Sequence, residues 1–170
     1  MIKASKYLMM AAVLTLAACG SSETTDSTET TTTEESSVPA TPTGEANLTI
    51  SGGDDMKFDN NYFEVKKGQK VTLTLKHTGV ATVETMGHNW VLLKAGTDIA
   101  EFGNKAVNAQ ATDYIPESEA GNIIAHTKLI GGGESTSITF DAPSEPGEYP
   151  FLCSFPGHYA MMQGIFMVTE

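Results

Sequence analysis

The side chains best suited to chemistry lie close together near the C-terminus of the 170-residue chain. Cys153, His158, Met161 and Met162 bring a thiol, an imidazole and two thioethers into ten residues. His88 offers a second imidazole about 65 residues earlier. Sulfur and imidazole are the donors that proteins use for copper, zinc and iron. The pattern therefore predicts a metal site assembled from two distant segments of the chain.

The mixture of donors indicates which metal this site would hold. Two histidines, one cysteine and a weakly held methionine are the donor set of a blue, or type 1, copper centre. Thiolate and thioether suit soft Cu(I), whereas imidazole suits both oxidation states, so little has to move when one electron is exchanged. A structural zinc site more often gathers four strong ligands. A catalytic Cys–His pair is a further alternative, but it needs more machinery than the residues offer.

The segments that carry these donors resemble those of the azurins, which are blue copper proteins. In azurins the ligand Cys, the ligand His and the axial Met are spaced C-x4-H-x3-M, and Cys153, His158 and Met162 match that spacing. Residues 86–90, Met-Gly-His-Asn-Trp, are similar to the azurin segment with the first histidine ligand. Residues 124–131 form a third similar stretch, so the resemblance covers the chain from about residue 47 to its end.

The resemblance implies a role for each matching residue. Five residues are expected to contact copper, with the Met162 sulfur and the Gly87 carbonyl at the axial positions: Gly87, His88, Cys153, His158 and Met162. Asn89 is expected to tie the two ligand segments together by hydrogen bonds around the cysteine sulfur, with Ser154 and Phe155 beside the ligands. Hydrogen bonds of this kind help to set a reduction potential.

The resemblance also implies an electron carrier that exchanges electrons with redox proteins, such as c-type cytochromes, and transforms no substrate. The electron is expected to pass through the exposed edge of His158. An apolar rim around this edge would serve brief docking, since interfaces for electron transfer are small and transient. The rim is expected to comprise Met56, Met86, Phe155, Pro156, Ala160 and Met161.

Three other functions remain open from the sequence. Copper storage or delivery could use the same ligands, and the eight methionines of the chain keep this alternative in view. A copper oxidase or nitrite reductase would need a second metal centre, but the chain has four histidines and no His-x-His pair. A metal-free surface lipoprotein with a binding role is the third alternative, and only metal analysis separates it from the carrier.

The remaining histidines and the only tryptophan are expected outside the metal site. His77 is similar to a buried azurin histidine near the copper, and we expect it to be packed, whereas His126 is expected on the surface. Trp90 is expected in the core because of its size. Azurins usually carry a disulfide near the N-terminal strand, but the matching positions lie near Ala46 and Gln69. The bridge is therefore missing, at a cost of about 2–4 kcal/mol.

The elements that must position the donors are mostly strands. Residues 71–76 alternate apolar and polar side chains with a period of two, as in a half-buried strand. Other short strand patterns occur at 47–51, 62–66, 89–93, 137–140 and 164–169. Clusters of Gly, Pro, Asn and Asp separate them. This pattern, with the resemblance, predicts an all-β fold, a Greek-key β-sandwich of the cupredoxin type.

One stretch has helical spacing instead. Between Asp98 and about Ala109 the apolar side chains recur at intervals of three and four residues. Asp98 is a suitable N-cap, and Glu101 three residues later is a suitable capping-box partner. We therefore expect one helical flap inserted in the β-sandwich.

The N-terminal part of the chain has the pattern of an export signal over residues 1–18. Two lysines precede an apolar run of twelve residues at 7–18, which is too short to cross a bilayer, since that needs about 20. Residues 16–19, Leu-Ala-Ala-Cys, resemble the lipobox of bacterial lipoproteins, which implies a lipid on Cys19. We therefore expect a lipid-anchored protein of the bacterial cell envelope that faces the periplasm or the cell exterior.

The mature chain divides into a predicted tether and a domain. Residues 19–46 are rich in Ser, Thr and Glu and are too polar to pack, so a disordered tether is expected. Residues 47–170 are expected to form the copper-binding domain, which holds eight Lys and no Arg against fifteen Asp and Glu. The lack of a basic stripe argues against a nucleic-acid partner.

Overall fold

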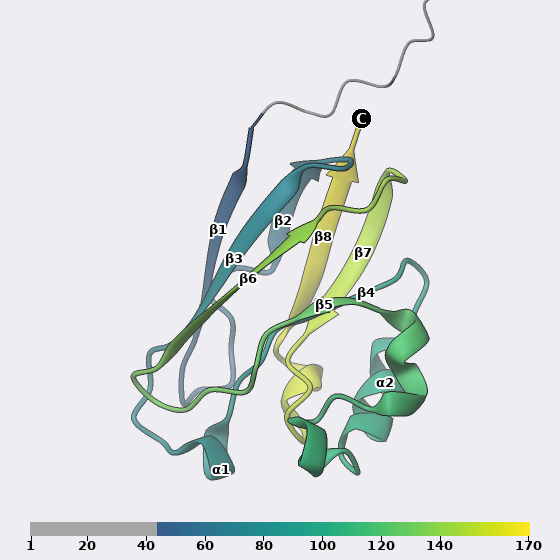
Figure 1. The fold of residues 1–170 in the computed structure, drawn as a ribbon. Helices are drawn as coiled ribbons and strands as arrows, with labels where there is room; N and C mark the ends of the chain where they lie inside the picture. The colour runs from purple at the N-terminus through teal and green to yellow at the C-terminus, as the bar shows by residue number, and fades with distance from the viewer. Residues whose placement is uncertain (1–43) are drawn as a thin grey trace, which may run out of the picture. The chain divides into compact units, whose positions relative to one another are not determined.

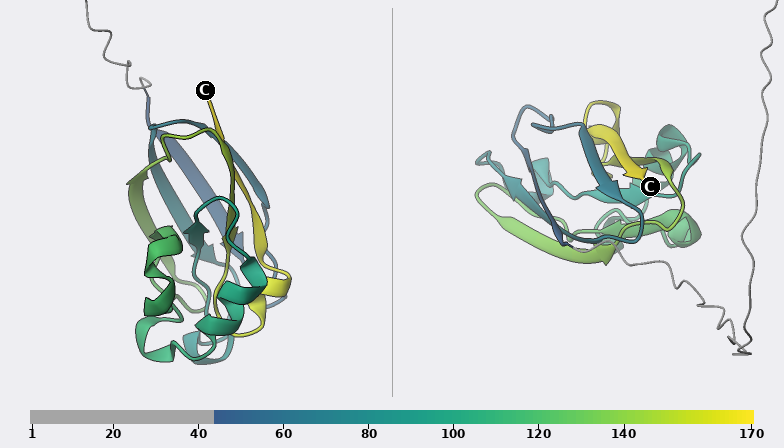
Figure 2. Two further views of the ribbon diagram at one scale, coloured as in Figure 1. Left: turned by 90° about the vertical axis from the view of Figure 1, so that its right-hand side faces the viewer. Right: turned by 90° about the horizontal axis from the view of Figure 1, so that it is seen from above.

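The computed structural model describes residues 44–170, which form two β-sheets with short helices at one end (Figure 1). The predicted signal, Cys19 and most of the predicted tether lie outside the described residues. The two sheets face each other and enclose the core, as the view from above shows (Figure 2). Among residues 44–170 no helix is long and apolar enough to cross a membrane.

Eight strands form the two sheets. The strands are β1 (Ala46–Gly52), β2 (Tyr62–Lys66), β3 (Lys70–His77), β4 (Val91–Leu93), β5 (Ile123–His126), β6 (Ser135–Asp141), β7 (Gly147–Leu152) and β8 (Gln163–Thr169). The helical segments are α1 (Val83–Met86), α2 (Ile99–Ala106), η1 (Gln110–Thr112), η2 (Glu117–Asn122) and η3 (His158–Ala160).

The sheets differ in size, and each contains one parallel pair of strands. The first has the order β1-β3-β6, with β1 parallel and β6 antiparallel to β3. The second has the order β2-β8-β7-β4-β5, in which only the β2–β8 pair is parallel. The registers place the loops after β1, β3, β5 and β7 at the same end of the domain, together with α1 (Figure 1). The loops after β3 and β7 contain every predicted copper ligand.

The core is divided into two apolar clusters. The larger one lies between the sheets and is built around Trp90, which is fully buried as predicted and packs on Phe140, Phe151 and Phe166. Alternating side chains of the strands fill it, as in β3, where every second residue is buried. The second cluster lies under α2 and includes Cys153 and Met162. Two predicted ligands thus belong to the apolar interior.

The predicted helical flap is present as α2. The side chain of Asp98 accepts a hydrogen bond from the Glu101 backbone N–H at 2.9 Å, which satisfies one of the free donors at the start of the helix. The Glu101 carboxylate instead pairs with Lys105 at 2.7 Å. The structure adds α1 and three short 3-10 turns, as well as strands β5 and β7, which the sequence pattern did not predict.

Candidate metal centre

Three of the predicted ligands meet at the loop end of the domain. One ligand atom each from His88, Cys153 and His158 lies within 4.8 Å of the other two, and all three side chains are buried. The Cys153 Sγ is 3.6 Å from the His158 Nδ1 and 4.0 Å from the Gly87 carbonyl oxygen. Among residues 44–170 this is the one group of three or more such side chains close enough to hold a metal ion.

The predicted axial methionine adjoins the same group. Met162 is fully buried. A Cβ added at Gly52 would approach the Met162 Cε to 2.8 Å and the His88 Cδ2 to 2.9 Å, so both side chains lie against the bare backbone of Gly52. Glycine at the end of β1 therefore provides the space in which the thioether and the imidazole meet. Met161, the worse match to the spacing, is 59% exposed.

His88 is held by the backbone of three neighbouring segments. Its N–H donates to the Ile130 carbonyl and its carbonyl accepts from the Ile130 N–H, both at 2.9 Å. The ring Nε2 lies 2.9 Å from the Gly53 carbonyl, and Nδ1 lies 3.0 Å from the Gly87 carbonyl. A neutral imidazole has one N–H, so donation from Nε2 to Gly53 leaves the Nδ1 lone pair on the side of Gly87 and Cys153.

His77 supports His88 from behind and is itself fully hydrogen-bonded. The two rings stack with centroids 4.2 Å apart and an angle of 9° between their planes. The His77 Nδ1 accepts from the Gly79 N–H at 3.1 Å, which leaves Nε2 to donate to the Met86 carbonyl at 2.8 Å. The prediction of a packed histidine outside the ligand set agrees with this geometry. His126 is exposed, as predicted.

The loop of residues 153–162 closes on itself. The Cys153 N–H donates to the Met162 carbonyl at 2.9 Å, and the Met162 N–H donates to the His158 carbonyl at 2.7 Å. Gly157 has φ = +81°, a conformation that glycine adopts without strain. The tight turn at Gly157 brings His158 and Met162 back to the side of Cys153.

Asn89 links the two ligand segments, as the resemblance predicted. Its Oδ1 accepts from the Ser154 backbone N–H at 2.8 Å, and its Nδ2 donates to the Ser154 hydroxyl at 2.8 Å and to the Asp113 carbonyl at 3.0 Å. All of Asn89 is buried. Asp113 and Tyr114 both have positive φ, at 54° and 61°. The amide of Asn89 thus secures a strained turn as well as the residue that follows the cysteine.

Burial keeps the nitrogen and sulfur donors uncharged in the absence of a cation. It lowers the pKa of His88, and it lowers the pKa of His158 to about 4, with smaller contributions from His88 and His77. Burial also raises the pKa of the Cys153 thiol to about 11, against the effect of backbone N–H groups of Asn89 and Phe155. These pKa shifts follow from the cost of charging a group in an apolar interior.

The donor set fits copper. Imidazole lone pairs, a thiol and a thioether converge without a carboxylate among the nearby donors, so the site favours a soft or borderline cation over Mg²⁺ or Ca²⁺. A bound cation would convert the thiol to the thiolate, since metal ligation requires the deprotonated form. One strong sulfur donor and two imidazoles leave zinc short of the four ligands usual in a structural site.

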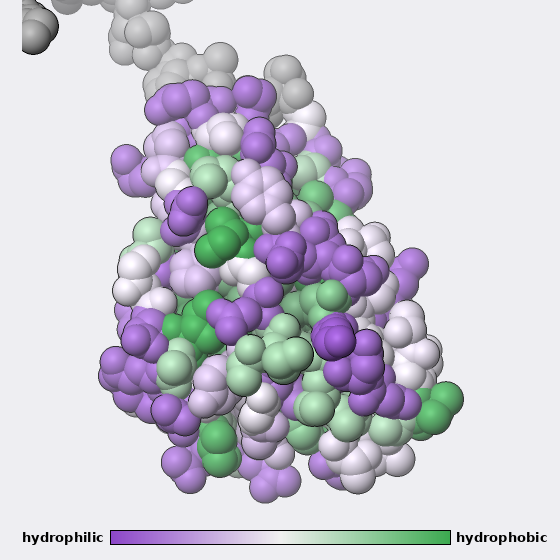
Figure 3. Space-filling view, turned by 180° about the vertical axis from the view of Figure 1, so that it is seen from behind, coloured by the Kyte–Doolittle hydropathy of each residue, from purple (hydrophilic) through white to green (hydrophobic). Residues whose placement is uncertain are grey.

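The predicted docking rim is only partly at the surface. Met56 and Met161 are exposed at 39% and 59%, and Ala160 is exposed, whereas Met86 and Pro156 are half-buried. Phe155 is a correction: its ring is buried, packs on Tyr114 and His158 and so supports the rim from below. His158 itself is 2% exposed, so its edge reaches solvent only through a small window. On the face seen in Figure 3, apolar side chains form small patches between polar ones.

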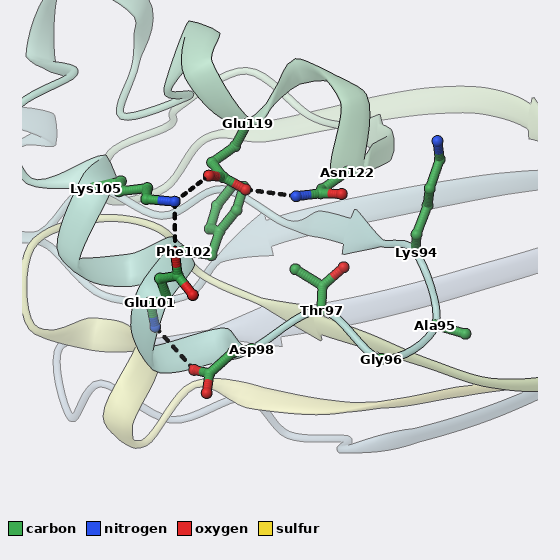
Figure 4. Close-up of a pocket in the computed structure, with 10 residues that line it drawn as sticks. All are labelled: Lys94, Ala95, Gly96, Thr97, Asp98, Glu101, Phe102, Lys105, Glu119 and Asn122. Atoms are coloured by element: carbon green, nitrogen blue, oxygen red, sulfur yellow. Dashed lines mark hydrogen bonds and ion pairs between the residues drawn. The ribbon is translucent and has the colours of Figure 1, made fainter.

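Beside the site, α2 is fastened to η2 by a buried carboxylate (Figure 4). The Lys105 amine lies between the carboxylates of Glu101 and Glu119, and Asn122 donates to Glu119 at 2.6 Å. These groups line an open cavity of about 400 Å³ together with the turn of residues 94–98. The hydrogen bonds from Lys105 and Asn122 lower the pKa of Glu119. The cavity shares no lining residue with the metal group, and the Lys105–Glu119 ion pair at its wall anchors α2.

Some residues of the site have no signature in the sequence. Gly53 contributes a carbonyl to His88, and Ile130 pairs with its backbone, but any residue type has these groups. Gly87 was expected at the site from the resemblance, but its need for space appears only in the fold, because a Cβ there would lie 2.5 Å from the Val83 carbonyl. In the sequence, the pair Gly52-Gly53 indicates only a turn. The contact of the Gly52 backbone with Met162 and His88 appears only in the fold.

The sequence of this chain is similar to those of known copper-binding proteins. Residues 44–169 match the model of the copper-binding proteins of the plastocyanin/azurin family. Azurin-1 of Alcaligenes xylosoxydans xylosoxydans is 40% identical over 129 residues, which cover 74% of this chain and 99% of that protein. Outer membrane protein H.8 of Neisseria meningitidis serogroup B is 45% identical over 123 residues, 71% of this chain. The chain spans 66% of the length of that H.8 protein.

A solved structure agrees with the sequence matches. Dithionite-reduced auracyanin of the photosynthetic bacterium Roseiflexus castenholzii superposes with a TM-score of 0.65 at 40% identity. The match covers 74% of this chain and 98% of auracyanin. The family match spans residues 44–169, which contain all the predicted ligands.

Proposed function

Because the chain belongs to the plastocyanin/azurin family of copper-binding proteins, we propose that it carries single electrons by means of one type 1 copper ion in the site of His88, Cys153 and His158. The observation that carries this proposal is the convergence of three buried donors within 4.8 Å in a loop cluster that also contains Met162. Copper supplies a one-electron couple between Cu(I) and Cu(II), which none of the side chains could supply at a mild potential.

The chain provides a fixed set of donors for that ion. In this proposal the imidazoles of His88 and His158 and the Cys153 thiolate would hold the ion as strong ligands, and the Met162 thioether and the Gly87 carbonyl would be its weaker ligands. Asn89 and Ser154 keep the two ligand segments in place through their hydrogen bonds. Because burial holds the donors rigidly, little rearrangement is needed between the two oxidation states.

The route of the electron leads through His158. Of the three strong ligands, His158 is the one nearest along the chain to the exposed residues Ala160 and Met161. We propose that redox proteins, c-type cytochromes among them, dock on the rim formed by Met56, Met86, Pro156, Ala160 and Met161. An apolar rim with few charges permits short contacts with more than one partner, as small transient interfaces do.

The N-terminal residues support a location at the cell envelope. We propose that residues 1–18 are removed and that a lipid on Cys19 anchors the chain, with residues 19–46 as the tether to the copper domain. The lipobox-like residues 16–19 and the likeness to a protein named outer membrane protein H.8 support the anchor. Substituting Cys19→Ala should move the chain from the membrane fraction to the soluble envelope fraction. A chain that stays in the membrane fraction would contradict the anchor.

Electron exchange tests the proposed function directly. The full chain loaded with Cu(II) is mixed with a reduced c-type cytochrome in a stopped-flow spectrometer, beside the copper-free chain. Fast oxidation of the cytochrome by the copper-loaded chain alone, with rates lowered by Met161→Lys in the rim, is the expected result. Tight Cu(I) binding without electron exchange would instead favour storage or delivery of copper.

A further inference from the structure

Helix α2 and the ligand loop lie side by side, and one aromatic ring joins them. Both ribbon views place η3 next to α2 (Figures 1 and 2). The Tyr159 ring rests on the helix at Gly103: a Cβ there would come within 2.3 Å of the Tyr159 Cδ1 and 2.5 Å of its Cγ. The Tyr159 hydroxyl donates to the Asn104 Oδ1 at 3.2 Å. The ring is therefore both packed against and hydrogen-bonded to the helix.

The presence of glycine at this position needs an explanation. Gly103 lies inside α2 and is buried, and glycine in a helix costs about 0.5–1 kcal/mol relative to alanine. Its φ is not positive, so the backbone conformation does not require glycine. The space that the Tyr159 ring needs is the remaining reason for glycine at this position. The helix is therefore less stable than it would be with alanine, but it accommodates a ring of the ligand loop.

The ring is attached to the least restrained ligand. Tyr159 directly follows His158 in η3, and the N–H groups of Met161 and Met162 donate to the His158 carbonyl. The His158 ring contacts Phe155 and His88, at centroid distances of 4.6 and 5.1 Å. Within residues 44–170, the one hydrogen bond of this ring is that of Nδ1 with the Cys153 sulfur, so no backbone carbonyl sets its orientation. Its position thus depends on how η3 is docked.

The helix is a firm support for this docking. Asp98 caps its start, and Phe102 and Ala106 are buried in the cluster that also holds Cys153 and Met162. Lys105 fastens it to Glu119 of η2 (Figure 4). A rigid helix that presents bare backbone to Tyr159 can therefore fix the height of η3 above the metal group.

We propose that Tyr159 is a positioning residue, which docks η3 on Gly103 and Asn104 of α2 and so sets the orientation of His158 in the copper site. The inference rests on the proposed function for its consequence in the copper-loaded chain, but the docking itself is a property of the metal-free chain. Groups that orient a metal ligand typically change metal affinity by about 10- to 100-fold when they are mutated.

The test is a pair of matched Gly→Ala substitutions in the full chain. Gly103→Ala places a methyl group in the space of the Tyr159 ring, whereas Gly121→Ala in η2 has nothing within 4 Å. We expect Gly103→Ala to shift the His158 ring resonances in NMR spectra of the metal-free chain. Competition with a chelator should show copper affinity lowered by about 10-fold. Gly121→Ala should change neither.

A double variant distinguishes an effect of the Tyr159 ring from an effect of the helix itself. In a Tyr159→Ala background the methyl group at residue 103 has free space, so adding Gly103→Ala should cause no additional loss of copper affinity. An equal loss in both backgrounds would overturn the proposal, because the helix and not the ring would then be responsible. Unchanged His158 resonances and copper affinity in Gly103→Ala with an intact Tyr159 would also overturn it.

Two milder variants keep the proposal testable if Gly103→Ala fails to fold. Tyr159→Phe and Asn104→Ala each remove the exposed hydrogen bond and leave the packing in place. Each should lower copper affinity about threefold, as the loss of one neutral hydrogen bond allows. Affinity and His158 resonances identical to those of the unmodified chain in both variants would contradict the docking role. If the unmodified chain binds no copper, the proposed function fails. The His158 resonances of the metal-free chain still show whether Tyr159 orients His158.

Discussion

The two sides of the metal group are built in different ways. On the sheet side, His88 is paired with Ile130 through its backbone, bonded to Gly53 through its ring and stacked on His77. On the loop side, His158 has backbone hydrogen bonds within its own loop, and its ring is positioned by packing. The difference indicates that the sheet side forms with the fold, whereas the loop side depends on its docking to α2 and on Asn89.

The largest loss of stability is expected when the connection between the two sides is cut. Asn89→Ala removes the hydrogen bonds to the Ser154 N–H and the Asp113 carbonyl in a fully buried place. Leaving such groups unpaired should lower the free energy of unfolding of the metal-free chain by about 2–4 kcal/mol, as measured in urea. The exposed Asn108→Ala should change it by less than about 0.5 kcal/mol. Similar values for both variants would show that the two sides are independent.

A direct comparison of the two histidines follows. His88→Ala in the metal-free chain removes one of the two hydrogen bonds to the Gly53 carbonyl, which also accepts from the Met56 N–H, and removes the stacking on His77. A cost of about 2 kcal/mol is therefore expected. His158→Ala removes packing and a weak contact with the Cys153 sulfur, for about 1 kcal/mol. Urea denaturation of both variants measures the difference. An equal or larger loss for His158→Ala would reverse the account of which side is the firmer one.

Neighbouring methionines of the loop offer a finer distinction. Met162→Leu conserves volume, so stability should fall by less than about 1.5 kcal/mol. The reduction potential of the copper-loaded chain should nevertheless change, because the axial ligand tunes it. Met161→Leu, at an exposed position, should alter neither quantity. Cyclic voltammetry measures the potential. A shift caused by Met161→Leu but not by Met162→Leu would show that Met161, and not Met162, is the methionine ligand.

The smallest effect is expected at the support of α2. The pKa of Glu119 lies below its usual value of about 4.5 because Lys105 and Asn122 donate hydrogen bonds to the carboxylate. Its contribution to stability is therefore complete above about pH 4.5 and is lost as the pH falls through the lowered pKa. The stability difference between the unmodified chain and Glu119→Gln should shrink on acidification. A difference that is constant from pH 7 to pH 3 would contradict this ion pair.

The features that depend on the type and spacing of side chains could be predicted from the sequence. The spacing of Cys153, His158 and Met162 and the segment around His88 indicated the metal group, and Asp98 was correctly predicted to begin a helix. The strand patterns, of which residues 71–76 show the clearest period of two, predicted six of the strands within a few residues. These signals are local and depend on residue type, which is what a sequence displays.

The remainder depends on backbone atoms and on neighbours that are distant in the sequence. Strand β7 contains Pro150, which argues against a central strand. Pro150 is tolerated because β4 pairs only with Phe151 and Leu152, so this part of β7 has β8 as its single neighbour. The carbonyl of Gly53 and the packing of Tyr159 on Gly103 likewise leave no pattern in the sequence. Only the fold brings these groups to the ligands.

The Cys153 thiolate and two imidazoles are proposed to bind copper in one site. This binding is tested most directly by visible absorption of the full chain with Cu(II), beside Cys153→Ser. We expect an intense blue band from thiolate-to-copper charge transfer in the unmodified chain and no such band in Cys153→Ser. A colourless copper-bound chain, or a blue band that survives in Cys153→Ser, would contradict the account.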